Sequence, residues 1–91
     1  MARLYRAGEY LIGTGAKRAQ MSDWGPMAKR LGSTEDEGLR LHDSLQLARH
    51  VDTTPASKRL GDRGQTPMSE SECREAVRRL ITEAVSQAVV P

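Results

Sequence analysis

The sequence contains few of the residues that build a large apolar core. Phenylalanine is absent, and the 91 residues include one tryptophan and two tyrosines. Leucine, isoleucine and valine number 16 of 91 residues, just under the ~20% level that is typical of disordered chains. Disordered chains also carry a high net charge, whereas this chain carries only +2. We therefore expect a single small domain with a marginal core.

The sequence also lacks paired cysteines and long apolar runs. A single cysteine, Cys73, excludes an internal disulfide, and we interpret it as a small buried side chain. No stretch approaches the ~18 apolar residues of a transmembrane helix, and no apolar signal segment follows Met1. These features predict an intracellular reducing compartment (the cytoplasm or an organelle matrix) or a virion, and they argue against secretion.

No residue pattern indicates catalysis, a metal site or a cofactor. His42 and His50 have no cysteine or carboxylate at ligand spacing, so we expect both histidines to be exposed. The glycine-rich stretch GEYLIGTGAKR has Thr14 where a phosphate-binding loop requires lysine. Asp43 and the acidic residues 35–37 are attributed to the start of a helix. Because no nucleophile, base and orienting group can be assembled, we expect a protein that is not an enzyme.

The apolar spacing predicts a mostly α fold with two well-defined helices, at about 34–51 and 67–89. The first begins with a capping box, Thr34 with Glu37. The second begins with Thr66 as the cap and Pro67 in the first turn, and Ser69 with Glu72 offers a second capping box. A short N-terminal helix is expected at 3–12, with a short strand as the alternative.

Glycine and proline interrupt the rest of the chain. Residues 1–32 are interpreted as a basic, Gly-rich N-terminal arm with only isolated turns of helix after residue 13. Residues 33–91 are interpreted as a helical region with a polar connector at 52–66, which we expect to be extended and structureless. Trp24 either plugs the arm into the domain or inserts into another subunit.

The C-terminal helix carries a continuous apolar stripe that follows an i±4n ridge, with alanines that would permit close approach by another helix. The rest of the chain has too few large apolar residues to cover this stripe generously. We therefore predict that the stripe binds a partner, and that Leu80→Asp abolishes this association without loss of solubility. The predicted partner-binding residues are Val77, Leu80, Ile81, Ala84, Val85, Ala88 and Val89.

The N-terminal arm carries six basic residues against two acidic ones. Such a segment can contact nucleic acid, an acidic protein or anionic lipid. The candidate anion or nucleic-acid contacts are Arg3, Arg6, Lys17, Arg18, Lys29 and Arg30, and the candidate arm anchors are Trp24, Tyr5 and Tyr10.

The tripeptide Leu4-Tyr5-Arg6 resembles the motif of the LYR family of small helical mitochondrial proteins. That resemblance implies binding to acyl carrier protein and a role as an assembly factor or complex subunit. The chain departs from the family pattern because Gly8 and Gly13 interrupt the first helix and no downstream phenylalanine exists. The resemblance is limited to the tripeptide, and we assign no family from it.

Taken together, these features predict a non-catalytic structural or accessory subunit of a larger macromolecular assembly, such as a virion particle or an organellar or membrane-associated complex. Its partners would be other protein subunits, and it needs no cofactor. One alternative is a small basic nucleic-acid-associated regulator. Another is a helical inhibitor or adaptor that docks on one partner through its C-terminal helix.

Overall fold

The computed structural model describes residues 2–13 and 19–89. Within these residues the structure contains helices and no strands, so the prediction of a mostly α fold is confirmed. The helices in chain order are α1 (Ala2–Ile12), α2 (Met21–Arg30), α3 (Glu35–Arg49), α4 (Thr54–Asp62) and α5 (Glu70–Val89).

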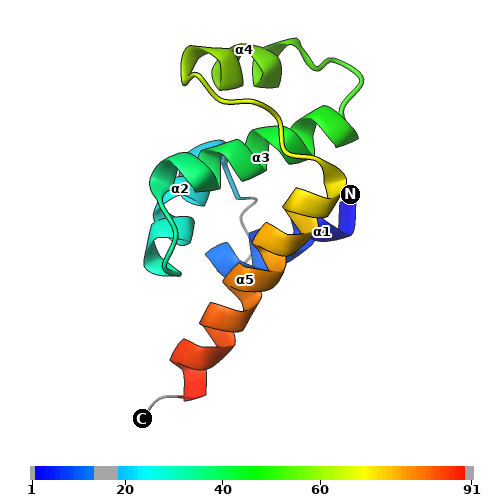
Figure 1. The fold of residues 1–91 in the computed structure, drawn as a ribbon. Coiled ribbons are helices and arrows are strands. Elements are labelled where there is room, and N and C mark those ends of the chain that lie inside the picture. The colour runs from blue at the N-terminus through cyan, green and yellow to red at the C-terminus, as the bar shows by residue number, and fades with distance from the viewer. Residues whose placement is uncertain (1, 14–18, 90–91) are drawn as a thin grey trace.

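Helix α3 lies at the centre of the arrangement (Figure 1). A tight turn after α2 folds α2 back against α3, and α4 covers α3 from the opposite side. Helices α1 and α5 pack against each other and also contact α3. The second half of α5 projects from the helical body (Figure 1), although Ala84 and Gln87 still contact it.

Thr34 and Ser69 are both confirmed as helix caps, and the reciprocal capping box is present at Ser69. The Thr34 hydroxyl accepts a hydrogen bond from the backbone N–H of Glu37 (3.1 Å). At the other helix, Glu72 accepts from the backbone N–H of Ser69 (3.1 Å) while the Ser69 hydroxyl accepts from the N–H of Glu72 (3.1 Å). Because this second cap sits at Ser69, α5 begins at Glu70, three residues later than the predicted start at 67.

Two segments that we expected to be irregular contain helices. Helix α2 lies within the predicted arm, and the Asp23 carboxylate accepts from the backbone N–H of Gln20 at its start (2.7 Å). Helix α4 lies within the predicted connector 52–66 and has Pro55 in its first turn, where proline is tolerated. Both helices are short, and packing against α3 stabilises them more than local propensity does.

Trp24 on α2 is fully buried and is the plug that joins the N-terminal segment to the domain. Its ring contacts Tyr5 of α1 (5.2 Å between ring centroids) and meets the ring of His42 of α3 edge-on (5.4 Å). Such aromatic contacts stabilise a core beyond the area they bury. The other buried members of this cluster are Met27, Ala28, Leu31, Leu41, Leu45, Cys73, Val77 and Leu80.

Two glycines allow the helices to approach this tryptophan. A Cβ atom on Gly8 would lie 2.1 Å from the Cη2 atom of Trp24, and a Cβ atom on Gly38 would lie 2.3 Å from the Trp24 carbonyl oxygen. Glycine lowers the stability of a helix interior by roughly 1 kcal/mol relative to alanine. Here the absence of a Cβ atom at both glycines permits close packing of α1 and α3 around α2.

Gly8→Ala is therefore expected to lower the free energy of unfolding by about 1–3 kcal/mol, because overpacking outweighs the gain in helix propensity. The buried Trp24 gives a fluorescence signal for urea denaturation. Gly61→Ala is the matched control, since Gly61 is also helical but has open space at its Cβ position. We expect that variant to match or exceed the stability of the parent, and equal effects of the two substitutions would contradict the packing argument.

Candidate interaction surface

The predicted partner-binding stripe of α5 is divided between the core and the solvent. Val77 and Leu80 are buried against the core together with Cys73, so these two predicted contact residues are core residues and do not form an accessible surface. Further along the helix, Ile81 is 41% exposed and Val85 is 57% exposed. The exposed part, which we call the distal face, consists of Ile81, Val85, Ala88 and Val89, with the half-buried Ala84 at its edge.

The exposure of the distal face follows from the length of α5. Its 20 residues span ~30 Å, and its second half projects from the body (Figure 1), which contacts it on the side of Ala84 and Gln87. Gln87 donates a hydrogen bond from Nε2 to the carbonyl of Arg30 (3.0 Å), and the Arg30 guanidinium donates to the carbonyl of Leu11 (2.8 Å). These bonds join α5 to the C-terminal ends of α2 and α1 and hold the projecting helix in place.

A second feature, which the sequence did not predict, is a buried charge cluster where α4 packs against α3. Asp43 is fully buried, and its carboxylate accepts hydrogen bonds from Arg59 Nε (2.9 Å) and from an Arg63 terminal nitrogen (2.5 Å). We attributed Asp43 to the helix start, and that interpretation is wrong. The carboxylate instead holds α4 and the residues after it against α3. The available sequence signal was the four-residue spacing of Arg59 and Arg63, which places both on one side of a helix.

His42 completes this cluster and is buried, contrary to the expected exposure. His42 Nδ1 lies 2.9 Å from an Asp43 carboxylate oxygen, and His42 Nε2 lies 3.1 Å from Gln46 Nε2. Because an amide nitrogen donates, Nε2 accepts and Nδ1 carries the proton that is donated to Asp43. His50, in contrast, is exposed as expected.

The charges and the burial of this cluster shift the pKa values of both ionisable groups. Burial lowers the pKa of His42 from its usual value of 6.5, and the pairing with Asp43 offsets this only in part. Burial alone would raise the pKa of Asp43, but hydrogen bonds from Arg59, Arg63 and His42 outweigh it and hold that pKa below its usual value. The folded protein therefore favours neutral His42 beside ionised Asp43.

The contacts of this cluster indicate a structural role, because its polar groups bind one another. Both ring nitrogens of His42 are engaged within the chain, and the neighbouring Ser44 hydroxyl accepts from the backbone N–H of Met68 (2.9 Å). Among the described residues, no group of three or more His, Cys, Asp or Glu side chains could hold a metal ion. Burial raises the pKa of the Cys73 thiol, as befits a core side chain.

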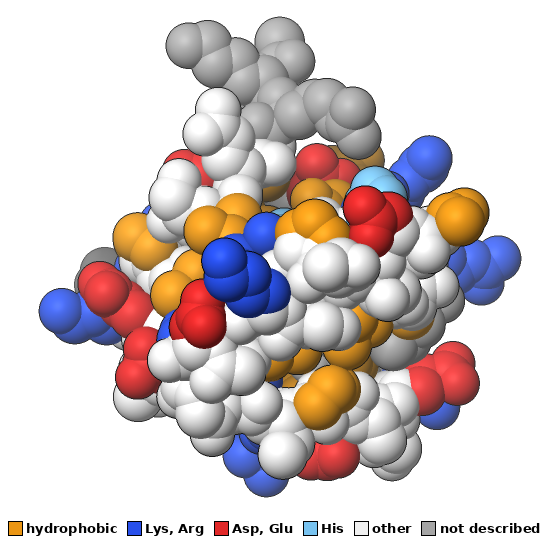
Figure 2. Space-filling model, turned by 90° about the horizontal axis from the view of Figure 1, so that it is seen from above, with side chains coloured by type: hydrophobic (Ala, Val, Ile, Leu, Met, Phe, Trp, Pro, Cys, Tyr) orange, Lys and Arg blue, Asp and Glu red, His pale blue; other side chains and the backbone are white. Residues whose placement is uncertain are grey.

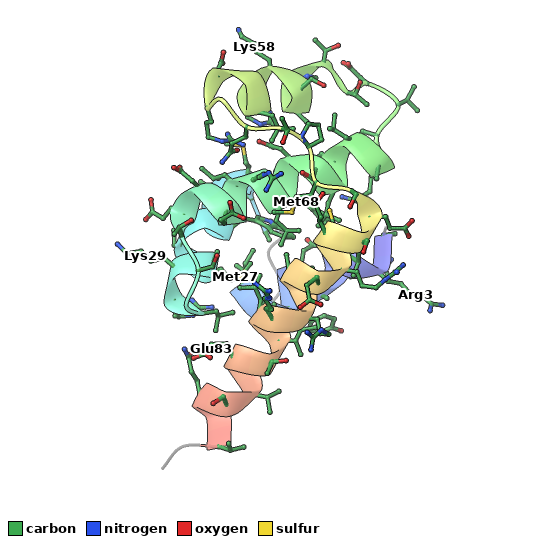
Figure 3. All side chains as sticks on the ribbon, in the orientation of Figure 1. Arg3, Met27, Lys29, Lys58, Met68 and Glu83 are labelled. Atoms are coloured by element: carbon green, nitrogen blue, oxygen red, sulfur yellow. The ribbon has the colours of Figure 1, made fainter. Side chains whose placement is uncertain are left out.

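The candidate basic contacts do not gather on one surface. Arg3 and Lys29 project from opposite sides of the molecule in Figure 3, and Lys17 and Arg18 lie outside the described residues. Seen from the α4 side, charges of both signs are interspersed (Figure 2). Of the candidate anchors, Tyr5 and Trp24 are core residues and only Tyr10, 87% exposed, faces solvent.

One cleft of about 180 Å³ lies on the side of α5 away from the distal face. Its lining is mostly apolar, with Glu37 and Arg79 as the charged side chains. None of the helices described here has the length and apolar character needed to cross a bilayer.

Comparison of the chain with protein-family models, with curated proteins and with solved structures finds no match. The functional argument below therefore rests on the surface and the core of this structure.

Asp43→Asn is expected to lower the free energy of unfolding by about 3 kcal/mol, because it leaves two arginines without their buried counter-charge. Hydrogen exchange should show the largest loss of protection in α4. Glu75→Gln is the control, since Glu75 pairs with Arg78 and Arg79 at an exposed site where ion pairs contribute little. Unchanged protection of α4 in Asp43→Asn would show that the carboxylate is not what holds this helix.

Stability is expected to fall as the pH is lowered from about 7.5 to about 5.5. The unfolded chain binds a proton at His42 near pH 6.5 while the folded chain resists protonation, so the contribution of neutral His42 is lost on acidification. Urea denaturation at the two pH values measures the difference. His42→Gln should flatten this dependence and His50→Gln should preserve it; the reverse pattern would contradict the assignment.

Proposed function

We propose that this chain is a non-catalytic structural or accessory subunit of a larger macromolecular assembly, and that it joins its neighbours through the distal face of α5. One observation carries the proposal. Three large apolar side chains at four-residue spacing, Ile81, Val85 and Val89, are 41%, 57% and 72% exposed on the half of α5 that projects from the body. Adjacent exposed apolar side chains on an ordered helix are typical of protein-binding surfaces.

The magnitude of this burial limits what the distal face can do alone. Full burial of a Val or Ile side chain stabilises by roughly 1.5–3 kcal/mol, and the three side chains are about half exposed on average. Covering them therefore contributes roughly 2.5–5 kcal/mol, which is comparable only to the low end of the cost of association. A tight complex would require contacts beyond the distal face.

The predicted extended arms do not enter this proposal, because α2 and α4 fold back onto α3. A virion particle and an organellar or membrane-associated complex are the assemblies that we propose. An inhibitor or adaptor that docks on one partner would use the same face. The identity of what co-purifies distinguishes these roles, since a multi-subunit particle supports the first and one defined protein supports the second.

A nucleic-acid-associated role is the second candidate and rests on the exposed basic residues of α1 and α2, Arg3, Arg6 and Lys29. Arg59 and Arg63 are occupied by Asp43, and Arg30 donates to Leu11, so these three arginines are already engaged within the fold. Binding of the whole protein to generic DNA and RNA at low salt tests this role. Steep loss of binding with added salt would favour it over the assembly role.

Val85→Asp is expected to remove the native partner from a tagged copy purified from its own cells, because a charge replaces the centre of the distal face. The Leu80→Asp test suggested by the sequence is unsuitable, since Leu80 is a core residue and its replacement would unfold the protein. Quantitative mass spectrometry of the co-purified proteins provides the measurement, with at least a tenfold loss expected.

Ser86→Asp is the matched control for this experiment. Ser86 is exposed and adjacent in sequence, yet it points about 100° away from Val85 around the helix. Circular dichroism should show both variants folded. If Val85→Asp retains the same partners as Ser86→Asp, the distal face does not mediate assembly.

A further inference from the structure

We propose that protonation of His42 releases α4 from α3, so that α4 acts as a flap that opens in acid. Helix α4 lies across α3 at one end of the molecule (Figure 1) and is joined to it by the Asp43 carboxylate. That carboxylate also accepts from His42, so the titrating group and the flap share one partner. The inference concerns this contact alone and does not depend on the distal face of α5.

His42 and α4 bind the same oxygen atom of Asp43. The Oδ1 atom lies 2.9 Å from His42 Nδ1, and it accepts a hydrogen bond from Arg59 Nε, also at 2.9 Å. A terminal nitrogen of Arg59 lies 2.8 Å from the same oxygen, while Arg63 after α4 binds the other oxygen. Neutral His42 leaves one negative charge between two positive ones, whereas protonated His42 adds a third positive charge at the oxygen that Arg59 uses. Because Asp43 is fully buried, water and salt screen the resulting repulsion only weakly.

The side of His42 away from Asp43 can accommodate the second proton. Gln46 Nε2 lies 3.1 Å from His42 Nε2, and the oxygen of the same amide, Gln46 Oε1, is buried without a hydrogen-bond partner among the described residues. A half-turn of this amide exchanges its two ends, so that Oε1 accepts from the protonated Nε2. The unfavourable effect of protonation therefore falls on the pairing with Arg59, and hence on the position of α4.

The other charged groups around His42 also oppose its protonation. Arg49, on the same helix, lies over the ring of Tyr5 of α1 (3.8 Å to the ring centroid), and that ring lies 5.9 Å from the His42 ring. The charges of Arg59 and Arg49 disfavour protonated His42, and Asp43 is the carboxylate that favours it. Movement of Arg59 away from Asp43 therefore makes it easier for His42 to accept a proton.

Helix α4 has few other contacts that would hold it on α3. Its buried residues are Ala56 and Leu60, and neither belongs to the core cluster around Trp24. A helix of nine residues is also too short to be stable by itself. The chain after α4 is attached to α3 separately, because the Ser44 hydroxyl accepts from the backbone N–H of Met68 (2.9 Å). The helix can therefore move about this point while the Trp24 cluster stays closed.

Thermodynamic linkage gives the direction and the size of the effect. With α4 closed, burial lowers the pKa of His42 below its usual value of 6.5. With α4 open, water reaches the Asp43 side of the ring and Arg59 has moved away, so the pKa of His42 returns toward that value. The open form therefore binds the proton more tightly, and acid favours opening. From about pH 7.5 to about pH 5.5, the equilibrium constant for opening should increase by up to about tenfold.

Hydrogen exchange of the whole protein at the same two pH values tests the flap. The protection factors of the α4 amides, which correct for the intrinsic pH dependence of exchange, should fall by roughly threefold to tenfold on acidification. The amides of α2 and α3 near Trp24 should remain more protected than those of α4 at both pH values, because the flap opens without global unfolding. Unchanged protection of α4, or equal protection of α4 and the core, overturns the inference.

His42→Gln removes the titrating group and should make the protection of α4 the same at both pH values. His50→Gln is its control, since His50 is exposed at the end of α3 and should leave the response of the parent unchanged. A full response in His42→Gln would show that another group controls α4.

Arg59→Gln provides a second test that leaves the side chains of the core in place. It removes the positive charge that opposes protonation of His42, so the fall in protection of α4 should be less than about twofold. Lys58→Gln is the matched control, because Lys58 carries the same charge on the outer side of α4 (Figure 3) and should respond as the parent does. Equal responses of these two variants would overturn the role of Arg59 in the flap.

Discussion

Burial of Trp24 is the constraint on which the rest of the structure depends. The chain has one tryptophan and no phenylalanine, so a single indole ring supplies much of the bulk around which three helices meet. The ring fits because Gly8 presents no side chain where α1 approaches it, and Gly38 presents none where α3 approaches the backbone of Trp24. A core poor in large residues thus reaches close packing by bringing backbones together.

The second interaction that stabilises the fold is electrostatic and joins α3 to α4. Few apolar residues of α4 are buried, namely Ala56 and Leu60, and the carboxylate of Asp43 adds hydrogen bonds from Arg59 and Arg63. A buried carboxylate is tolerated only when charged donors satisfy it, and here both its oxygens are satisfied. Hydrogen-bonded ion pairs therefore attach α4 to α3, whereas burial of apolar side chains attaches α5 to the core. The attachment of α4 depends on the ionised state of Asp43.

Neither the Trp24 cluster nor the Asp43 cluster buries the distal face of α5. The body of the molecule is large enough to bury Cys73, Val77 and Leu80, and the apolar stripe continues past the point where the body ends. The bonds from Gln87 to Arg30 and from Arg30 to Leu11 hold the helix in this position. An apolar ridge presented on an ordered helix loses less conformational freedom on binding than a flexible segment would, which favours association through it.

The sequence by itself determined the elements whose signals are local. The caps Thr34 and Ser69 fix the starts of α3 and α5, because each hydroxyl accepts from the free backbone N–H three residues on. The four-residue apolar spacing identifies α5 as amphipathic. Only the tertiary structure decided that α2 and α4 are helical, that Asp43 and His42 are buried, and which part of the stripe is exposed. Those outcomes depend on contacts between residues far apart in the chain, and the propensity of one segment does not carry that information.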